Sequence, residues 1–255
     1  MCNELQKFYD WFASNKLSIN VEKTTYIFFN YNRPTINTDM NVVMNGISLE
    51  RVNSTKFLGV HIDANLSWVN HIAHISNQVS KGIGILSKLK HIMPPKIMRS
   101  IYLSLVLPHL SYCSSIWSGT TKTNLNKLYI LQKRAVRNIT CALPRSSTNE
   151  IFSSLNLLKL EDLISLNVAT FTYRCLNNLI PGSFSSFYTY NRSIHNHATR
   201  HSDKLRNTLY RKSRSQLSLR YRSTSLWNSL PNSFHAKQSL ASFRKCLQNY
   251  FIRQY

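Results

Sequence analysis

The chain has 255 residues and 43% hydrophobic content, enough for packed cores in one large domain or two small ones. Its 32 Lys and Arg residues outnumber 10 Asp and Glu, which gives a formal net charge of +22 and a pI of about 10.1. This balance argues against a neutral partner and favours a polyanion. Nucleic acid is the first choice, and an anionic membrane surface or a ribosome-like assembly is the alternative.

The cysteines and the apolar segments narrow the class of protein further. The five cysteines lie far apart, at Cys2, Cys113, Cys141, Cys175 and Cys246. They form neither a CxxC metal pair nor a compact disulfide framework, so a reducing compartment fits best. The start, MCNELQKF, has no apolar region, and we expect no signal peptide. The longest apolar stretch, residues 101–112, is too short to span a bilayer and contains Pro108.

The first 62 residues are predicted to form one helix followed by a small antiparallel sheet. Apolar residues at helical spacing predict the helix over residues 3–15. Asn45-Gly46 is typical of a type I′ hairpin turn, because both central residues of that turn need positive φ. A loop is expected around Pro34. Strands are predicted over residues 24–30, 40–44, 47–52 and 56–62, the last reading KFLGVHI.

From residue 63 onward the pattern is helical. Apolar residues from Trp68 to Leu86 recur every three or four positions and predict a long helix that ends before Pro94. Further helices are predicted over residues 96–107, 124–139, 160–177, 225–230 and 240–251. Residues 183–224, rich in Ser, Asn, His and Arg, have no clear order. We therefore predict an α+β chain with three regions, 1–62, 63–142 and 143–255.

Motifs of autonomous enzymes and metal sites are absent from the sequence. His71 and His74 have ligand-compatible spacing on a helix, but no HExxH accompanies them. The same holds for His195, His197 and His201 in HNHATRH. We interpret these histidines as surface or nucleic-acid-facing groups and predict no metal site. There is no GxSxG, P-loop or GxGxxG motif, and Gly82-x-Gly84 is expected to serve close helix packing.

Three basic stretches are the candidate nucleic-acid contacts. No carboxylate occurs between Asp63 and Glu150, and Asp203 alone follows Asp162. Basic faces of this kind neutralise phosphates without sequence choice and give strongly salt-dependent affinity. The alternative for any single run is a solvated surface. The candidates are Lys81, Lys88, Lys90, Lys96 and Arg99 around Pro94-Pro95, then Lys127, Lys133, Arg134 and Arg137, and finally Arg211, Lys212 and Arg214 within the dense stretch 206–222, which also holds Tyr210 and Tyr221.

Four segments in this order carry a resemblance to a known family. They read WFASNKLSINVEKTTYIFF, STKFLGVHIDANLSWVNHI, LYILQKRAVRNI and STSLWNSLP. Together they resemble the reverse transcriptases of non-LTR (LINE-type) retrotransposons, nearest the jockey-like group, over nearly the whole chain. The resemblance implies that residues 1–62 are the last part of a polymerase palm, that residues 63–142 form the thumb, and that residues 143–255 form a basic helical C-terminal region.

The resemblance also implies roles for individual residues. Lys23 matches the lysine of the LSINVEKT motif, which is proposed to protonate the departing pyrophosphate as a general acid. Phe57, Leu58, Gly59 and Val60 match the primer-grip motif, in which a glycine lets the backbone approach the primer end. The alternatives are a solvated lysine at a strand entry and a tight pairing of two strands.

The departure from the family pattern concerns the metal ligands. Polymerases of this type hold two Mg²⁺ ions with paired aspartates, which lie upstream of the motifs that this chain contains. Glu4 and Asp10 lie on the helix that follows and are not substitutes. We therefore expect no cofactor in this fragment, and binding of an RNA and DNA template–primer without catalysis by the fragment alone. A non-enzymatic basic nucleic-acid-binding module and a non-functional relic are the alternatives.

Overall fold

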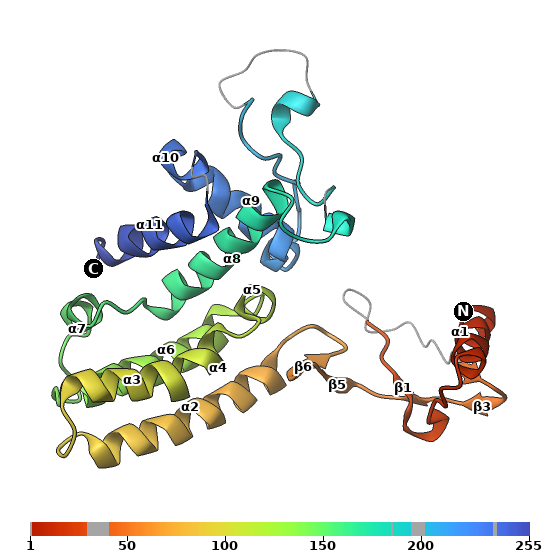
Figure 1. The fold of residues 1–255 in the computed structure, drawn as a ribbon, viewed down its shortest axis with the longest axis horizontal. Helices are drawn as coiled ribbons and strands as arrows, with labels where there is room; N and C mark the ends of the chain where they lie inside the picture. The colour runs from red at the N-terminus through yellow and green to blue at the C-terminus, as the bar shows by residue number, and fades with distance from the viewer. Residues whose placement is uncertain (1, 30–40, 185, 195–201, 237–238) are drawn as a thin grey trace. The chain divides into compact units, whose positions relative to one another are not determined.

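The computed structural model describes residues 2–29, 41–184, 186–194, 202–236 and 239–255 (Figure 1). The chain divides into two compact units, Met1–His71 and Ile72–Tyr255. The expected loop around Pro34, the start of the strand predicted at Met40 and the motif with His195, His197 and His201 lie outside the described residues.

The first unit builds a small core beneath its N-terminal helix. Helix α1 (Cys2–Ser14), which the apolar spacing predicts over residues 3–15, packs against β2 (Val43–Met44). Val21, Val42, Met44 and Leu49 are buried, and side chains of α1 such as Tyr9 pack against them. Several apolar side chains of α1, including Phe8 and Trp11, stay exposed.

The predicted Asn45-Gly46 hairpin is confirmed. Strands β2 and β3 (Ile47–Ser48) pair antiparallel, with Met44 opposite Ile47. Asn45 has φ 48° and Gly46 has φ 75°, the positive values that a type I′ turn requires.

The prediction of one antiparallel sheet is wrong in two respects. The described strands form three separate two-stranded ladders, and β1 (Thr25–Tyr26) pairs parallel with β4 (Glu50–Arg51). A parallel pair needs a long connection between its strands, and Tyr26 and Glu50 are more than twenty residues apart in the sequence. The predicted single strand KFLGVHI is instead a hairpin of β5 (Ser54–Phe57) and β6 (Val60–Asp63). Leu58 at φ 45° and Gly59 at φ 82° reverse the chain there.

Asp63 connects this hairpin to the next helix. Its carboxylate accepts hydrogen bonds from the amides of Ser67 (2.9 Å) and Trp68 (2.8 Å), the residues directly before α2 (Val69–Leu89). A side-chain acceptor at this position satisfies backbone donors at a helix start.

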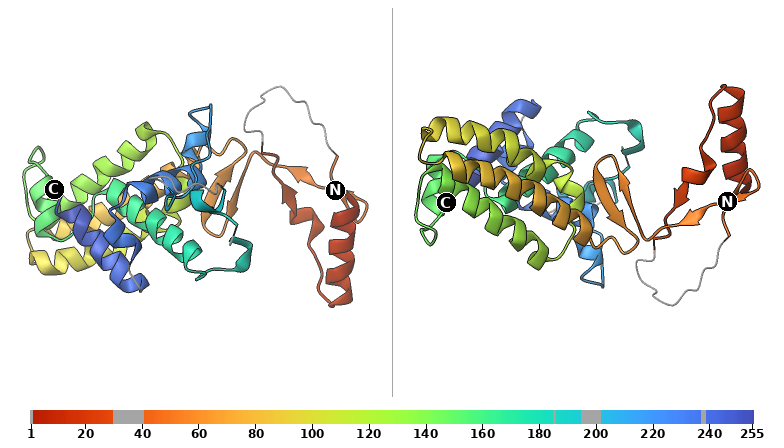
Figure 2. Two further views of the ribbon diagram at one scale, coloured as in Figure 1. Left: turned by 90° about the horizontal axis from the view of Figure 1, so that it is seen from above. Right: turned by 90° about the horizontal axis from the view of Figure 1, so that it is seen from below.

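The second unit is helical in the residues described, as the periodicity predicts (Figures 1 and 2). The mostly buried helix α8 packs against α4, α5, α6, α9 and α11. The short helices α5, α7 and α10 were not predicted, and the chain between residues 96 and 111 is broken at Val106 into two helices. The elements are α3 (Pro95–Leu105), α4 (Leu107–Ser111), α5 (Ser114–Trp117), α6 (Lys122–Ile139), α7 (Asn149–Ser154), α8 (Leu160–Leu176), α9 (Leu219–Ser229), α10 (Asn232–His235) and α11 (Leu240–Ile252).

A helix that spans a bilayer needs about 20 predominantly apolar residues. Within the described ranges, none of the helices combines the length and the apolar character needed to cross a membrane.

Candidate nucleic-acid interface

Lys23 lies at the end of a short 3₁₀ turn, η1 (Val21–Lys23), with its side chain exposed. The Asn20 side chain accepts a hydrogen bond from the Lys23 amide at 3.1 Å, and the Thr24 hydroxyl donates to the Asn20 carbonyl at 2.8 Å. The polar opening of the LSINVEKT segment is therefore an N-capped turn. It fixes the backbone at Lys23 and leaves the ammonium group in solvent.

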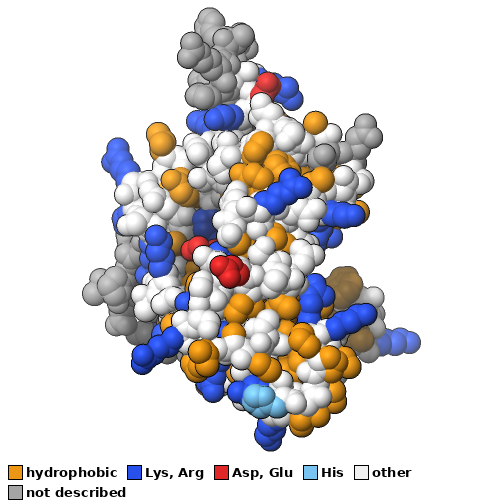
Figure 3. All heavy atoms as spheres, turned by 90° about the vertical axis from the view of Figure 1, so that its left-hand side faces the viewer, with side chains coloured by type: hydrophobic (Ala, Val, Ile, Leu, Met, Phe, Trp, Pro, Cys, Tyr) orange, Lys and Arg blue, Asp and Glu red, His pale blue; other side chains and the backbone are white. Residues whose placement is uncertain are grey.

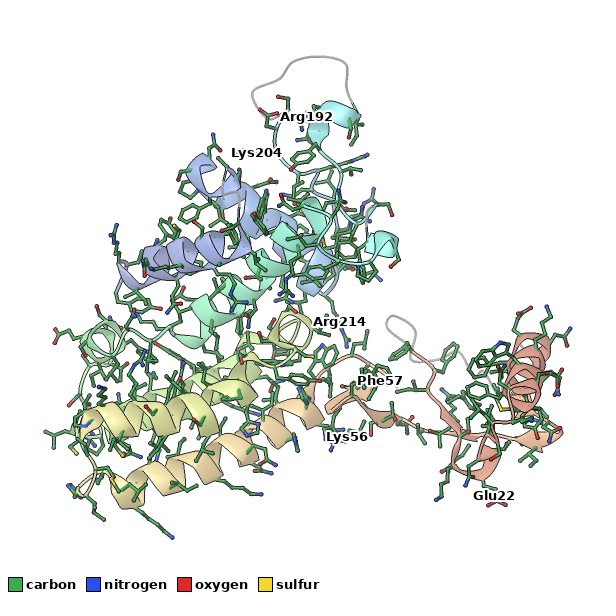
Figure 4. All side chains as sticks on the ribbon, viewed as in Figure 1. Glu22, Lys56, Phe57, Arg192, Lys204 and Arg214 are labelled. Atoms are coloured by element: carbon green, nitrogen blue, oxygen red, sulfur yellow. The ribbon has the colours of Figure 1, made fainter. Side chains whose placement is uncertain are left out.

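The segment Phe57 to Val60 forms the tip of the β5–β6 hairpin. Phe57 and Leu58 are 62% and 74% exposed, whereas Val60 is buried. Lys56 and Phe57 project from this hairpin in Figure 4. Gly59 is needed for the turn itself, because its φ of 82° is unfavourable for residues with a Cβ. The hairpin thus presents two large apolar side chains beside a lysine.

The carboxylates of α1 do not suit a metal ion. Glu4 pairs with Lys7 at 2.9 Å, and Asp10 accepts a hydrogen bond from the side-chain Nε2 of Gln6 at 3.0 Å. No group of three potential metal ligands comes together among the residues described. Within the described part of the chain, neither Glu4 nor Asp10 therefore joins a group of metal ligands.

The prediction that His71 faces solvent or nucleic acid is wrong. Its side chain is buried, with an exposed fraction of 3%. Its Nδ1 atom accepts a hydrogen bond from the backbone amide of His61 at 3.4 Å, and the two imidazole rings lie 6.2 Å apart. His71 thus packs inside the first unit, whereas His74 is half-buried.

Two of the predicted basic residues are brought together by the helices of the second unit. Lys88 of α2 and Arg134 of α6 line one groove of about 300 Å³, together with Ser80, Ile83, Gly84 and Ser87. Lys81 and Lys96 are exposed, as is Lys127 on α6. These side chains are available to an external anion.

Other residues predicted to contact nucleic acid instead interact with groups of the protein itself. Arg99 donates from Nε to the Leu155 carbonyl at 2.7 Å. Arg137 donates from Nε and Nη2 to the Ser146 carbonyl at 3.1 and 2.9 Å. Both guanidinium groups are half-buried and fasten loops to helices. The Lys133 ammonium lies 4.6 Å from the centre of the Tyr129 ring, and Lys90 is half-buried.

The dense basic stretch 206–222 also contains both exposed basic residues and a basic residue that bonds other parts of the protein. Arg211, Lys212 and Arg214 are exposed. Arg222 is half-buried instead: it donates to the Ser118 hydroxyl (2.7 Å), the Ser115 carbonyl (2.7 Å) and the Leu217 carbonyl (3.0 Å). Burial lowers the pKa of Arg222 to about 10. Tyr210 and Tyr221 meet edge to face, with ring centres 5.9 Å apart.

A second cleft, of about 450 Å³, was not foreseen from the sequence. It lies between α6 and the start of α8 and is lined by Tyr129, Lys159 and Asp162 among others. The Tyr255 hydroxyl donates to Asp162 at 2.7 Å and accepts from the Lys159 amide at 2.9 Å. Burial raises the pKa of Asp162, against the opposing effects of the Tyr255 hydrogen bond and the Lys159 charge. The residues involved are too far apart in the chain for local patterns to link them.

Positive charge is concentrated on helices of the second unit. Residues 64–149 contain eleven Lys and Arg and no Asp or Glu, so no ion pair can form within this segment. On the face shown in Figure 3, blue basic groups greatly outnumber red acidic ones. Basic side chains without acidic partners in the same segment favour an anionic partner.

Comparisons with known proteins give relatives of one kind. The RNA-directed DNA polymerase from mobile element jockey of Drosophila melanogaster is 29% identical over 170 residues, 65% of this chain and 18% of the relative. Its counterpart in Drosophila funebris is 27% identical over 166 residues, 63% of this chain and 18% of the relative. A probable RNA-directed DNA polymerase from transposon BS of Drosophila melanogaster is 26% identical over 136 residues, 52% of this chain and 15% of the relative.

No family model and no solved structure matches the chain. The chain spans less than a fifth of the length of the curated relatives it matches. The resemblance inferred from its motifs is nevertheless confirmed over about half to two thirds of the chain: by sequence, this chain is similar to the RNA-directed DNA polymerases of jockey and other non-LTR mobile elements.

Proposed function

We propose that the chain is a fragment of a non-LTR retrotransposon RNA-directed DNA polymerase that binds an RNA and DNA template–primer duplex but lacks catalysis by itself. The observation that carries the binding proposal is the acid-free segment 64–149, whose helices present Lys81, Lys88, Lys96, Lys127 and Arg134. Phosphate neutralisation by such side chains releases counterions and gives affinity that falls with salt. The polymerase relatives make a template–primer the natural polyanion.

In this proposal residues 1–62 are the end of the palm, residues 63–142 are the thumb and residues 143–255 are a basic C-terminal region. The exposed ammonium of Lys23, held on its capped turn, would donate a proton to the pyrophosphate oxygen in an intact polymerase. Phe57 and Leu58, exposed at the β5–β6 tip, would contact the apolar faces of the primer end. Val60 is buried and would support the tip from beneath.

The expected lack of catalysis rests on the carboxylates. Two-metal chemistry requires acidic side chains that converge on the ions, which activate the nucleophile and the leaving group in an intact enzyme. Glu4 and Asp10 instead interact with residues of their own helix. We therefore assign no metal-dependent step to the residues of this chain.

Two assays test the two parts of this proposal. Fluorescence anisotropy of a labelled RNA–DNA hybrid, titrated with the chain between about 50 and 200 mM salt, is expected to show affinity that falls steeply with salt. Salt-insensitive or absent binding would refute the binding part. In primer extension with magnesium, the chain and a Lys23→Ala variant are expected to give the same background. Extension by the chain above this control would refute the lack of catalysis.

One observation favours a second candidate, a non-enzymatic nucleic-acid-binding module. All the predicted phosphate contacts, from Lys81 to Arg214, lie in the compact unit Ile72–Tyr255. Hybrid binding that survives removal of residues 1–62 would support this module. A non-functional relic would instead unfold without cooperativity, so a single sharp thermal transition of the chain would count against it.

A further inference from the structure

The groove between α2 and α6 differs from the other basic surfaces because it is lined by cations, hydroxyls and a glycine. Ser80, Gly84 and Ser87 follow one another at helical spacing on α2, and Lys88 continues the same face. Arg134 reaches the groove from α6. All of these residues except the buried Ile83 are exposed, and no acidic residue lines the groove.

The shape of the groove depends on Gly84. Apart from its chain neighbours and the backbone of its own helix, a Cβ built at Gly84 would meet no heavy atom within 4 Å, so this glycine leaves open space rather than contact with another helix. Gly82 is the opposite case, because a Cβ there would lie 2.9 Å from Val106 Cγ2. The expected close packing of the Gly82-x-Gly84 pair therefore holds for Gly82 alone. The missing side chain at Gly84 lets an external group approach the helix closely.

We propose that this groove is the seat of a backbone phosphodiester of the bound nucleic acid, held by Lys88 and Arg134 and by the hydroxyls of Ser80 and Ser87. The inference rests on the proposed nucleic-acid binding and adds a defined subsite to it. The groove volume of about 300 Å³ leaves room for a phosphate group. An Arg and a Lys supply the charge, and Ser hydroxyls are common donors to phosphate oxygens.

The subsite makes no contact with base edges in this proposal. Phosphate contacts position a duplex without reading its sequence. Binding through the groove is therefore expected to show little preference among hybrids of different sequence. Loss of either cation is expected to weaken all of these hybrids by a similar factor.

The charge test uses the full chain and the labelled hybrid. Lys88→Gln and Arg134→Gln are each expected to weaken binding about eightfold at 0.1 M salt, because one phosphate contact releases about 0.9 counterion. Each variant is also expected to reduce the slope of log K against log salt by about 0.9. Lys245→Gln is the matched control, since it removes one exposed charge from α11, outside the groove. Equal losses for Lys88→Gln and Lys245→Gln would overturn the proposal.

The shape test changes no charge. Gly84→Phe is expected to fill the groove and weaken binding severalfold, whereas Ile85→Phe, at an exposed neighbour outside the lining, is expected to leave it unchanged. Circular dichroism and thermal unfolding of both variants show whether each is folded. If Gly84→Phe is folded and binds like the wild type, the groove is not the subsite. If the wild-type chain itself fails to bind the hybrid, the proposed function fails before the groove is tested.

A free phosphate is the other source of the same chemistry. Inorganic phosphate added at constant ionic strength is expected to displace the hybrid no better than chloride does, because a lone phosphate gains none of the duplex contacts elsewhere. Displacement by low phosphate concentrations that disappears in Lys88→Gln would assign the groove to a free phosphate and overturn the assignment to the nucleic-acid backbone.

Discussion

Gly82 and Gly84 lie two residues apart on α2 and are expected to respond in opposite ways to the same substitution. Alanine is more favourable than glycine in a helix by about 1 kcal/mol, and both positions gain this term. A Cβ at Gly84 meets nothing within 4 Å, so Gly84→Ala should raise the free energy of unfolding by about 1 kcal/mol.

Gly82→Ala adds a packing cost to the same gain. The new Cβ would lie 2.9 Å from Val106 Cγ2 and 3.1 Å from the Leu105 carbonyl oxygen. Val106 is fully buried, and a β-branched side chain has few rotamers into which it can move. Overpacking of this kind costs about 1–3 kcal/mol. The two variants should therefore differ by about 1–3 kcal/mol, with Gly82→Ala the less stable.

Urea unfolding followed by far-UV circular dichroism measures this difference directly. The comparison is well controlled, because helix propensity, net charge and the number of added atoms are the same in both variants. Equal midpoints and slopes for Gly82→Ala and Gly84→Ala would refute the packing of α2 against the α3–α4 junction at Val106.

Two further predictions concern polar groups withdrawn from solvent. Burial raises the pKa of Tyr102 to about 12, while the unfolded chain ionises this phenol near pH 10. The protonated phenol therefore contributes fully to the free energy of unfolding below pH 10, and about 3 kcal/mol of this contribution is lost as the pH rises to 12. Urea midpoints of the wild type should fall over this pH range, and those of Tyr102→Phe should fall less. Arg222→Gln should cost about 3 kcal/mol, because it leaves the carbonyls that Arg222 bonds without their donor. The salt slope of hybrid binding should not change; a reduced slope with unchanged stability would instead place Arg222 in the interface.

The sequence alone predicts the elements whose pattern depends on near neighbours. Ile72, Ile75, Val79, Ile83 and Leu86 recur at helical spacing, and all five are buried along α2. Asn45-Gly46 specifies its own turn through the φ angles it tolerates. The sequence motifs also identify the polymerase relatives, because these motifs are themselves local strings of residues.

A turn that contains an apolar residue is harder to predict from the sequence. Leu58-Gly59 reverses the chain although Leu58 is not a typical turn residue, and the apolar run KFLGVHI therefore predicts one strand instead of two. Gly59 is the residue in this run that could have indicated the turn. A Gly within a strand pattern marks a bulge or bend as readily as a close approach to a ligand.

Tertiary structure decides which of many basic residues face solvent. Arg99 and Arg222 cannot be told from Lys88 and Arg134 by sequence pattern, yet they donate to carbonyls of segments far away in the chain, and Arg137 donates to the carbonyl of Ser146 in the loop that follows its helix. A charge is stable away from water only when donors and acceptors from other segments surround it. The groove at Gly84 arises in the same way, since it needs α2 and α6 side by side. Periodicity along one helix identifies its apolar face, but the partner that covers this face depends on the whole chain.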